Sequence, residues 1–201
     1  NGNIRIYLAE HCKWVTMSVD MTKELFQMQI RTATTELRHF QPMDLEVVYQ
    51  IGCQKTIVTQ LNMTAFQSQQ EAQSFLTMLM NDEDAWAIVD RATQVVQGLI
   101  MLAPTLSVDG QSVAAYELSF AILPAYQRRG IISAVLPATM QAYAQETGVN
   151  TFNAACFLTN QASQASLQKV QFEKTYQSQL PDYLGGQRVQ YYRRIVNVFK
   201  L

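Results

Sequence analysis

The sequence predicts a mixed α/β (α+β) domain with a mostly antiparallel sheet, and three observations support this fold class. Strand-like segments, either apolar or alternating, occur along the whole chain, and segments of helical spacing separate them. Of the 201 residues 48% are hydrophobic, which suffices for one domain with a substantial core. No internal repeat or interdomain linker divides the sequence. We therefore expect helices layered on a single sheet.

The first half of the chain predicts the following elements. Residues 1–34 form an extension with a strand over 4–8 and a helix that Ser18 or Asp20 caps and that carries Leu25, Met28 and Ile30. A strand over 35–40 precedes a helix that Pro42 opens and Gly52 ends. A helix over 67–80 and a polar loop over 81–84 lead to two strands, over 85–92 and 94–103.

The strand over 113–123 follows a hairpin turn at Asp109-Gly110 and has the clearest alternation in the chain. Its even positions are bulky and apolar, whereas its odd positions, among them Glu117 and Ser119, are small or polar. A small, polar face leaves room for a ligand, and the same pattern also suits a half-exposed strand.

Pro124 ends this strand, and the helix that follows ends at Gly148. Pro137 lies inside that helix, which predicts a kink or a shorter helix. The remaining expected elements are a strand over 151–158, a helix over 160–170, a strand over 172–179, a turn at 185–186 and a final strand over 187–199.

Composition excludes several function classes. A net charge of -1 argues against a protein whose main role is nucleic-acid binding. Three scattered cysteines, Cys12, Cys53 and Cys156, suit a reducing cytoplasm better than a disulfide framework. With two histidines and no paired-cysteine motif, we expect no metal site. No apolar run reaches about 18 residues and no signal peptide is evident, so we expect a cytoplasmic protein with no membrane partner.

The sequence QRRGIIS at 127–133 joins the central strand to the following helix. A helix N-terminus offers unpaired N–H groups and the positive end of its dipole, which favours phosphate binding. Gly130 permits close backbone approach or a positive φ, and Arg128 and Arg129 add positive charge for a diphosphate or ribose phosphate. Neither the GxxxxGK[ST] nor the GxGxxG motif is present. An ordinary turn with solvated arginines is the alternative interpretation.

Together with Asn160–Ser163, Lys169 and Phe172, this pattern resembles the GNAT acetyltransferase superfamily, in particular its RimJ/RimL-like branch of ribosomal-protein N-terminal acetyltransferases. The resemblance implies a twisted sheet, split at its centre beside the strand 113–123 and flanked by helices on both faces. It implies an acetyltransferase domain over 35–201, with residues 1–34 packed on it as an extension. Acetyl-CoA, the implied co-substrate, would lie in the split.

The resemblance also implies which residues hold acetyl-CoA. The pyrophosphate would bind the backbone N–H groups of residues 128–133, and the pantetheine arm would pair with the backbone of Ile122 and Leu123. Asn160 would contact the pantetheine or the acetyl end. The expected cofactor-binding residues are therefore Ile122, Leu123, Gln127, Arg128, Arg129, Gly130, Ile131, Ile132, Ser133, Asn160, Ser163 and Lys169.

Acetyl transfer requires a neutral amine, whose unperturbed pKa is about 8 for an α-amine and about 10.4 for Lys, so a base or desolvation of the amine has to assist. Glu117 is the candidate base, acting through a water, although it also suits a surface carboxylate or an ion pair. Ser119 would orient the water or the amine, or is simply a small residue at a crowded split. Asn160 is the third candidate catalytic residue, and a strand N–H near Leu123 is the candidate oxyanion donor.

We therefore expect an N-acetyltransferase that acts on a protein N-terminal α-amine or a small-molecule amine by direct attack in a ternary complex. The helices of 43–80 and the last hairpin, near Tyr183 and Tyr191, would contact the acceptor. Three departures from the family pattern, Ile132, Gln171 and Ser166, favour the alternative of a catalytically weak or inactive CoA-binding regulatory module. An unrelated α/β domain is the third hypothesis, and the sequence is compatible with a homodimer.

Overall fold

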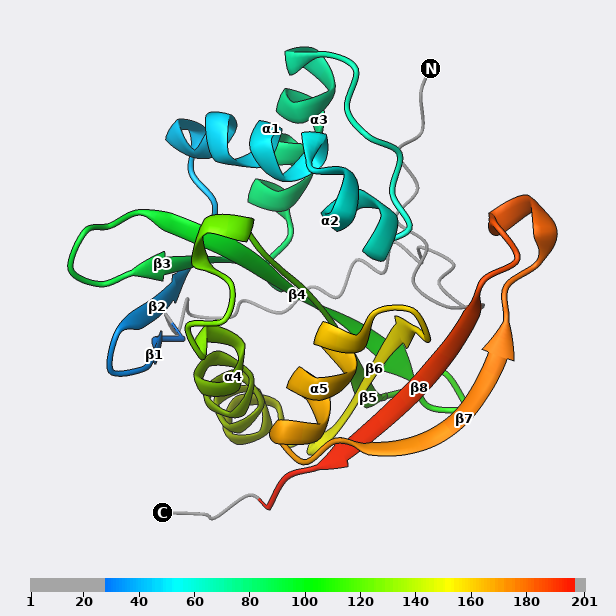
Figure 1. Ribbon diagram of the computed structural model, residues 1–201. Coiled ribbons are helices and arrows are strands. Elements are labelled where there is room, and N and C mark those ends of the chain that lie inside the picture. The colour runs from blue at the N-terminus through cyan, green and yellow to red at the C-terminus, as the bar shows by residue number, and fades with distance from the viewer. Residues whose placement is uncertain (1–27, 198–201) are drawn as a thin grey trace.

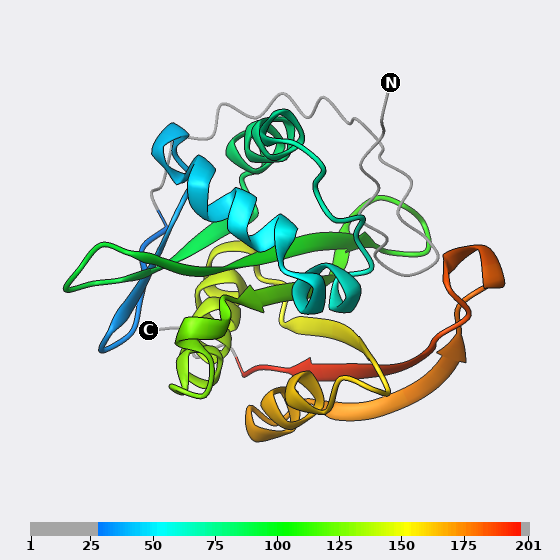
Figure 2. The same ribbon diagram turned by 45° about the horizontal axis from the view of Figure 1, so that its top comes forward.

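The computed structural model describes residues 28–197 as one eight-stranded sheet with helices on both faces (Figure 1, Figure 2). The strand order is β1-β2-β3-β4-β5-β6-β8-β7. The strands are β1 (Ile30–Arg31), β2 (Thr35–Arg38), β3 (Ala85–Asp90), β4 (Val96–Leu106), β5 (Val113–Ile122), β6 (Thr151–Phe157), β7 (Glu173–Gln179) and β8 (Arg188–Ile195). The helices are α1 (Leu45–Cys53), α2 (Lys55–Gln60), α3 (Gln69–Asn81), α4 (Ile131–Thr147) and α5 (Gln161–Lys169), with short 3-10 turns η1 (Pro42–Asp44), η2 (Pro124–Tyr126) and η3 (Asp182–Leu184).

The sheet splits between its two central strands. All neighbouring strands are antiparallel except β5 and β6, which run parallel and pair only from Tyr116–Leu118 to Phe152–Ala154. In contrast, β5 stays paired with β4 as far as Ile122. Among the described strands, the second half of β5 therefore has a neighbour on one edge only, which confirms the predicted mostly antiparallel sheet with a central split.

Each face of the sheet carries its own hydrophobic core. Figure 2 shows α1, α2 and α3 on one face and α4 and α5 on the other. Leu136, Met140 and Tyr143 of α4 are fully buried in the second core, together with Tyr116 and Leu118 of β5. In the first core α3 buries its own apolar stripe, which consists of Ala72, Phe75, Leu76 and Leu79. The bulky, apolar face that the alternation of β5 predicted thus packs against α4.

Gly52 does not end a helix, contrary to the sequence prediction. It lies inside α1, which continues to Cys53, and the short helix α2 follows after one residue. A Cβ atom at Gly52 would lie 2.0 Å from the ring of Phe66, so this glycine is present for close packing rather than for a turn. The helix α2 was not predicted.

Some of the other element boundaries agree with the sequence prediction, and others differ. The helix α4 runs through Pro137 without being shortened and ends at Gly148, which has a φ of +74° as a helix C-cap. Ile30 lies in β1, paired with Leu37, and not in a helix. The last strand ends at Ile195. Met28 is not helical either. The expected strand over 4–8 and the part of the expected helix before residue 28 lie outside the described residues.

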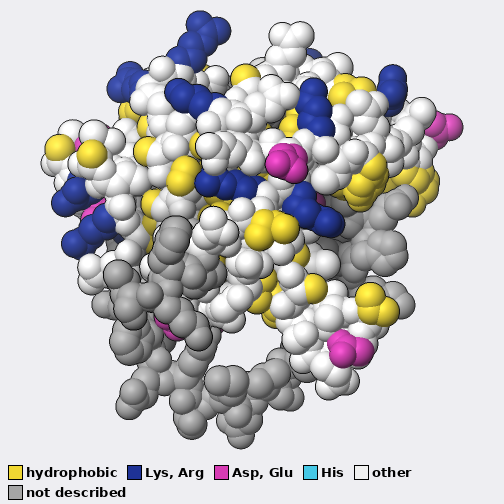
Figure 3. All heavy atoms as spheres, turned by 90° about the horizontal axis from the view of Figure 1, so that it is seen from below, with side chains coloured by type: hydrophobic (Ala, Val, Ile, Leu, Met, Phe, Trp, Pro, Cys, Tyr) yellow, Lys and Arg dark blue, Asp and Glu magenta, His cyan; other side chains and the backbone are white. Residues whose placement is uncertain are grey.

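The surface and the helices carry further information on possible partners. Within residues 28–197 no helix combines the length and the apolar character that crossing a membrane requires. Figure 3 shows one face of the molecule, on which Lys and Arg side chains lie spread among hydrophobic and uncharged ones. In the same part of the chain no three His, Cys, Asp or Glu side chains lie close enough together to hold a metal ion.

Candidate active site

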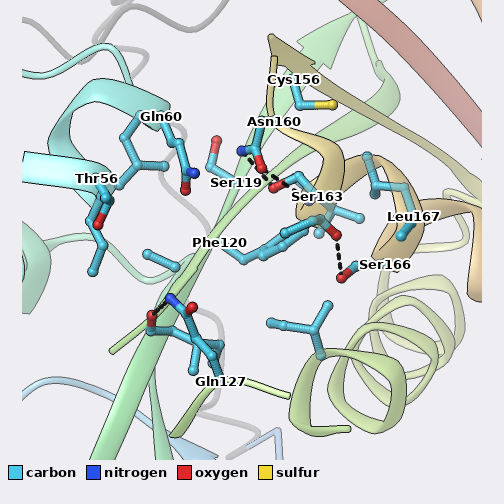
Figure 4. A pocket seen from close by; sticks show the side chains of 18 of the residues that line it. Thr56, Gln60, Ser119, Phe120, Gln127, Cys156, Asn160, Ser163, Ser166 and Leu167 are labelled. Carbon is cyan, nitrogen blue, oxygen red and sulfur yellow. Dashed lines mark hydrogen bonds between the residues drawn. The ribbon is translucent and has the colours of Figure 1, made fainter. Parts of the chain in front are cut away.

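A cleft of about 860 Å³ opens where β5 and β6 separate, and α2, the η2–α4 turn and α5 complete its walls (Figure 4). Every predicted site residue except Leu123 lines it. These residues are Glu117, Ser119, Ile122, Gln127, Arg128, Arg129, Gly130, Ile131, Ile132, Ser133, Asn160, Ser163 and Lys169. Residues from five separate parts of the sequence therefore meet around one hollow.

Leu123 is the one predicted site residue that does not line the cleft. Its side chain is 6% exposed and packs in the core under α1–α3. Its backbone N–H donates a 2.9 Å hydrogen bond to the carbonyl of Gln97 on β4. This N–H therefore points away from the split, and it is not available either to a pantetheine arm or to an oxyanion.

The same register identifies which backbone groups do face the split. In an antiparallel pair, successive residues direct their N–H and C=O groups to opposite edges of the strand. Because Leu123 is bonded to β4, Phe120 and Ile122 direct theirs to the opposite edge, where β6 no longer pairs. Phe120, which sequence reasoning missed, is half-buried and its ring lies in the cleft (Figure 4).

The turn before α4 is held against the end of β5. The side-chain Nε2 of Gln127 donates a 2.9 Å hydrogen bond to the carbonyl of Ile122. Arg128 has a φ of +62° and Gly130 a φ of +76°, so the chain passes twice through the left-handed region. Arg129 donates to the carbonyl of Ala125 over 2.8 Å, which holds its guanidinium over η2.

The N-terminus of α4 carries exposed backbone donors. Gly130 is the N-cap and provides no side-chain acceptor, and the first helical hydrogen bond runs from Ala134 N–H to the Gly130 carbonyl. Within the described residues the N–H groups of 131–133 therefore have no partner. The side chain of Ile132 is 8% exposed and belongs to the core, so its size does not block the turn.

Asn160 caps α5 on the other side of the cleft. It is 7% exposed; its Oδ1 accepts from the N–H of Ser163 over 3.1 Å, and its Nδ2 donates to the Ser163 hydroxyl over 2.9 Å. Asn160 is therefore the N-cap of α5. The Ser166 hydroxyl donates to the carbonyl of Ala162 one turn earlier, and Lys169 is exposed in the last turn.

Glu117 lies on β5 at the narrow end of the split, between Ala103 of β4 and Asn153 of β6. Its carboxyl is half-buried, and burial raises its pKa above the ordinary value for Glu. Among residues 28–197 it has neither a hydrogen-bond partner nor an ion-pair partner, so no ion pair within the described part of the chain accounts for it. Ser119 follows two residues later, on the same face of the strand.

Residues 35–173 match the family model described as an acetyltransferase (GNAT) domain. The chain belongs to this family. The GNAT domain is therefore an acetyltransferase, and the match covers β2 to the start of β7, including both walls of the cleft. Comparison with curated protein sequences gives no match.

Solved structures share the GNAT fold. An acetyltransferase (GNAT family) from Bacillus anthracis has a TM-score of 0.74 at 16% identity, covering 83% of this chain and 98% of that one. An acetyl transferase from Salmonella typhimurium that modifies the N-terminal serine of ribosomal protein L7/L12 has a TM-score of 0.68 at 21% identity, with coverages of 84% and 99%. Spermidine N-acetyltransferase from Vibrio cholerae, in complex with CoA and spermine, has a TM-score of 0.68 at 14% identity, with coverages of 82% and 96%.

The GNAT cleft includes residues without a sequence signal. Thr56 and Gln60 of α2 face Ser119 and Asn160 across it (Figure 4), although α2 lies about sixty positions away from β5 in sequence. Cys156 of β6 also lines the cleft, and burial raises the pKa of its thiol to about 11. The thiol is therefore protonated at neutral pH, as expected for a buried cysteine without a nucleophilic role.

Proposed function

We propose that this protein transfers the acetyl group of acetyl-CoA to a primary amine, either a protein N-terminal α-amine or a small-molecule amine, while both substrates are bound. One observation carries this proposal: backbone donors and a carboxylate that have no partner among residues 28–197 line the same cleft. Glu117 precedes Ile122 by five strand residues, roughly 16 Å at the usual rise per residue. This span leaves room for an extended ligand between the base and the anion site.

The residues present fit the diphosphate of CoA. The three N–H groups of 131–133 and the dipole of a 17-residue helix provide an anion site. Arg128, free of the contacts that hold Arg129, and Lys169 of α5 add positive charge on two walls. Gln127 would contribute indirectly. Its hydrogen bond to the Ile122 carbonyl of β5 keeps the turn in place and leaves the N–H groups of 131–133 exposed to the ligand.

The open edge of β5 fits the amide groups of a pantetheine arm. The N–H and C=O of Phe120 and the N–H of Ile122 face the split, whereas the carbonyl of Ile122 is already engaged by Gln127. An extended amide chain would pair with these groups as an added strand does. Asn160 keeps one N–H and one lone pair beyond its bonds to Ser163, and these are the groups it would offer to the ligand.

Acetyl-CoA supplies an activated thioester carbonyl, and the protein has to provide a deprotonated amine beside it. We assign Glu117 as the general base, acting directly or through one water. Its raised pKa makes the carboxylate a stronger proton acceptor than an exposed glutamate. Ser119, two residues nearer the open end, would orient the amine or the water. No covalent intermediate with the protein is needed, because positioning of the two substrates provides the main catalytic effect.

The acceptor would enter between α2 and β8. Thr56 and Gln60 of α2 and Tyr191 of β8 line this part of the cleft, whereas Tyr183 is 80% exposed and lies outside the lining. The neighbouring structures name two acceptor classes, a protein N-terminus and a polyamine. Both present a primary amine, so either is compatible with Glu117.

A CoA-binding module without turnover is the competing function. Of the three departures that suggested it, Ile132 is a core residue, and Gln171 has the left-handed φ of +62° that a glycine would adopt more easily. Ser166 still leaves the protonation of the leaving thiolate unassigned. Glu117 favours turnover, because it is buried without a partner among the described residues and a binding module gains nothing from such a carboxylate.

The test combines binding and turnover. Acetyl-CoA should raise the melting temperature, and free CoA thiol should appear when peptides or small amines are added. Stabilisation without release on any amine would favour the binding module, and absence of stabilisation at saturating acetyl-CoA would overturn both functions.

The proposal includes a cytoplasmic location, supported by the scattered cysteines, and a homodimer as an option that size-exclusion chromatography decides. It also treats residues 1–34 as an extension of the 35–201 domain, for which the β1–β2 pairing is the support.

A further inference from the structure

A second hollow of about 310 Å³ adjoins the main cleft. It lies between α2 and the connection from β6 to α5, and Gln187 before β8 closes its outer side. Thr56, Gln60 and Asn160 line both hollows, so the small one continues from the acceptor side of the large one. A molecule bound in the main cleft can therefore extend past these shared residues onto a second polar surface.

The chemistry of this side hollow differs from that of a cation site. Its lining consists of three threonine hydroxyls, three side-chain amides, the ring of Phe157 and the ammonium group of Lys55. Among residues 28–197 no acidic residue lines the side hollow, and Glu117 is the one carboxylate that lines the main cleft. Lys55 is exposed and belongs to neither of the two ion pairs in residues 28–197.

These charges select between acceptors. A polyamine would bring one or more further ammonium groups into a hollow that has no carboxylate to pair with them and has Lys55 to repel them. A carboxylate in the same position would pair with Lys55 and accept hydrogen bonds from the hydroxyls and amides. Like-charge contacts of this kind are a general means of rejecting wrong partners.

We propose that the side hollow is an acceptor subsite that binds a carboxylate or an uncharged polar group behind the reacting amine, with Lys55 as its specificity-determining residue. The inference rests on the proposed acetyltransferase function. It selects an amine carried on a neutral or acidic chain and disfavours polyamines. The carboxylate belongs either to an acidic side chain of a peptide or to a small amino acid, and both present the same chemistry to Lys55.

The test measures kcat/KM by CoA-thiol release for matched acceptors. One series consists of hexapeptides that differ only by Asp, Asn or Lys at the second, third or fourth position, and free glutamate and spermidine complete the set. The wild-type protein should prefer an Asp peptide or glutamate to the matched Lys peptide or spermidine by about fivefold or more at the position that reaches Lys55. Lys55→Glu should reverse this preference, and Lys55→Gln should reduce it toward unity.

The control variant is Lys174→Glu on β7, which makes the same charge change outside both hollows and should keep the wild-type preference. A dependence on Lys55 with glutamate alone would assign the carboxylate to a small-molecule acceptor, and a dependence with peptides alone would assign it to a protein N-terminus. Release of CoA thiol with an unchanged preference in Lys55→Glu, or a wild-type preference for spermidine, would overturn the subsite while leaving the proposed function intact. No release with any acceptor would overturn the proposed function itself, and the subsite with it.

Discussion

The side chain of Gln127 donates a 2.9 Å hydrogen bond from Nε2 to the backbone carbonyl of Ile122. The donor lies in the turn before α4, and the acceptor lies on the edge of β5 that faces the split. The bond therefore joins the anion-binding turn to the strand edge at which a pantetheine arm would pair. The same bond gives the Ile122 carbonyl a hydrogen-bond donor within the protein, so this carbonyl does not need one from the ligand.

We predict that Gln127→Ala weakens acetyl-CoA binding without unfolding the protein. A typical hydrogen bond contributes about 1 kcal/mol, which corresponds to a Kd raised about fivefold. Titration calorimetry with acetyl-CoA measures this change. The control is Gln70→Ala, an exposed glutamine on α3 whose replacement should leave the Kd unchanged. Equal affinities of both variants would show that the turn needs no connection to β5.

Gly130 and Gly148 form a matched pair for testing the anion site. Both are caps of α4 with positive φ, +76° and +74°, and neither has an atom within 4 Å of an added Cβ. Alanine at either position should therefore cost about 1 kcal/mol of stability through backbone strain alone. We predict that both variants lose a similar amount in thermal unfolding, but that only Gly130→Ala, at the cleft end of the helix, weakens acetyl-CoA binding. Equal weakening by both variants would argue that the helix N-terminus does not bind the diphosphate.

Gln171 provides a prediction on stability. It has a φ of +62° directly before the buried Phe172, a conformation that glycine adopts without strain. Gln171→Gly should stabilise the protein by about 0.5–1 kcal/mol, which raises Tm by about 1–4 °C for a chain of this size. Gln168→Gly, three residues earlier inside α5, should lower Tm because the same exchange in a helix is unfavourable. A lower Tm for Gln171→Gly would show that this side chain makes stabilising contacts of its own.

The local elements of this fold could be predicted from the sequence because each has a pattern of its own. The Asp109-Gly110 turn, the alternation of β5 and the stripe of α3 depend on residues close together in the chain. The prediction that Gly52 ends a helix was wrong, because this glycine is needed for packing against the ring of Phe66, fourteen positions away in the sequence. The short helix α2 was not predicted, because six residues carry too little periodicity to identify a helix.

The site shows the same limit at the level of single backbone groups. Alternation along β5 shows on which face a side chain lies, but the edge to which an N–H points depends on the register with the neighbouring strand. The Leu123 N–H is bonded to Gln97 of β4, so the sequence prediction chose the wrong residue and omitted Phe120. The wall formed by Thr56 and Gln60 required the tertiary structure, because nothing in the sequence links α2 to β5.

Glu117→Gln gives opposite effects on activity and stability. Because burial raises the pKa of the folded carboxyl above its unfolded value, the folded state binds more protons than the unfolded state between these two values, and stability falls as pH rises through that interval. Above the folded pKa the penalty is complete, so we predict that Glu117→Gln raises Tm there. This gain should shrink as the pH falls through the folded pKa and should be absent below the ordinary pKa of glutamate. We predict in addition that kcat falls far more than the affinity for acetyl-CoA, and that the acidic limb of the wild-type pH–rate profile, where Glu117 becomes protonated, is absent from the variant.

Glu146→Gln on the exposed face of α4 is the control, and it should change neither measurement. An unchanged kcat in Glu117→Gln would remove this residue from catalysis, and an unchanged Tm would show that its burial costs the fold nothing.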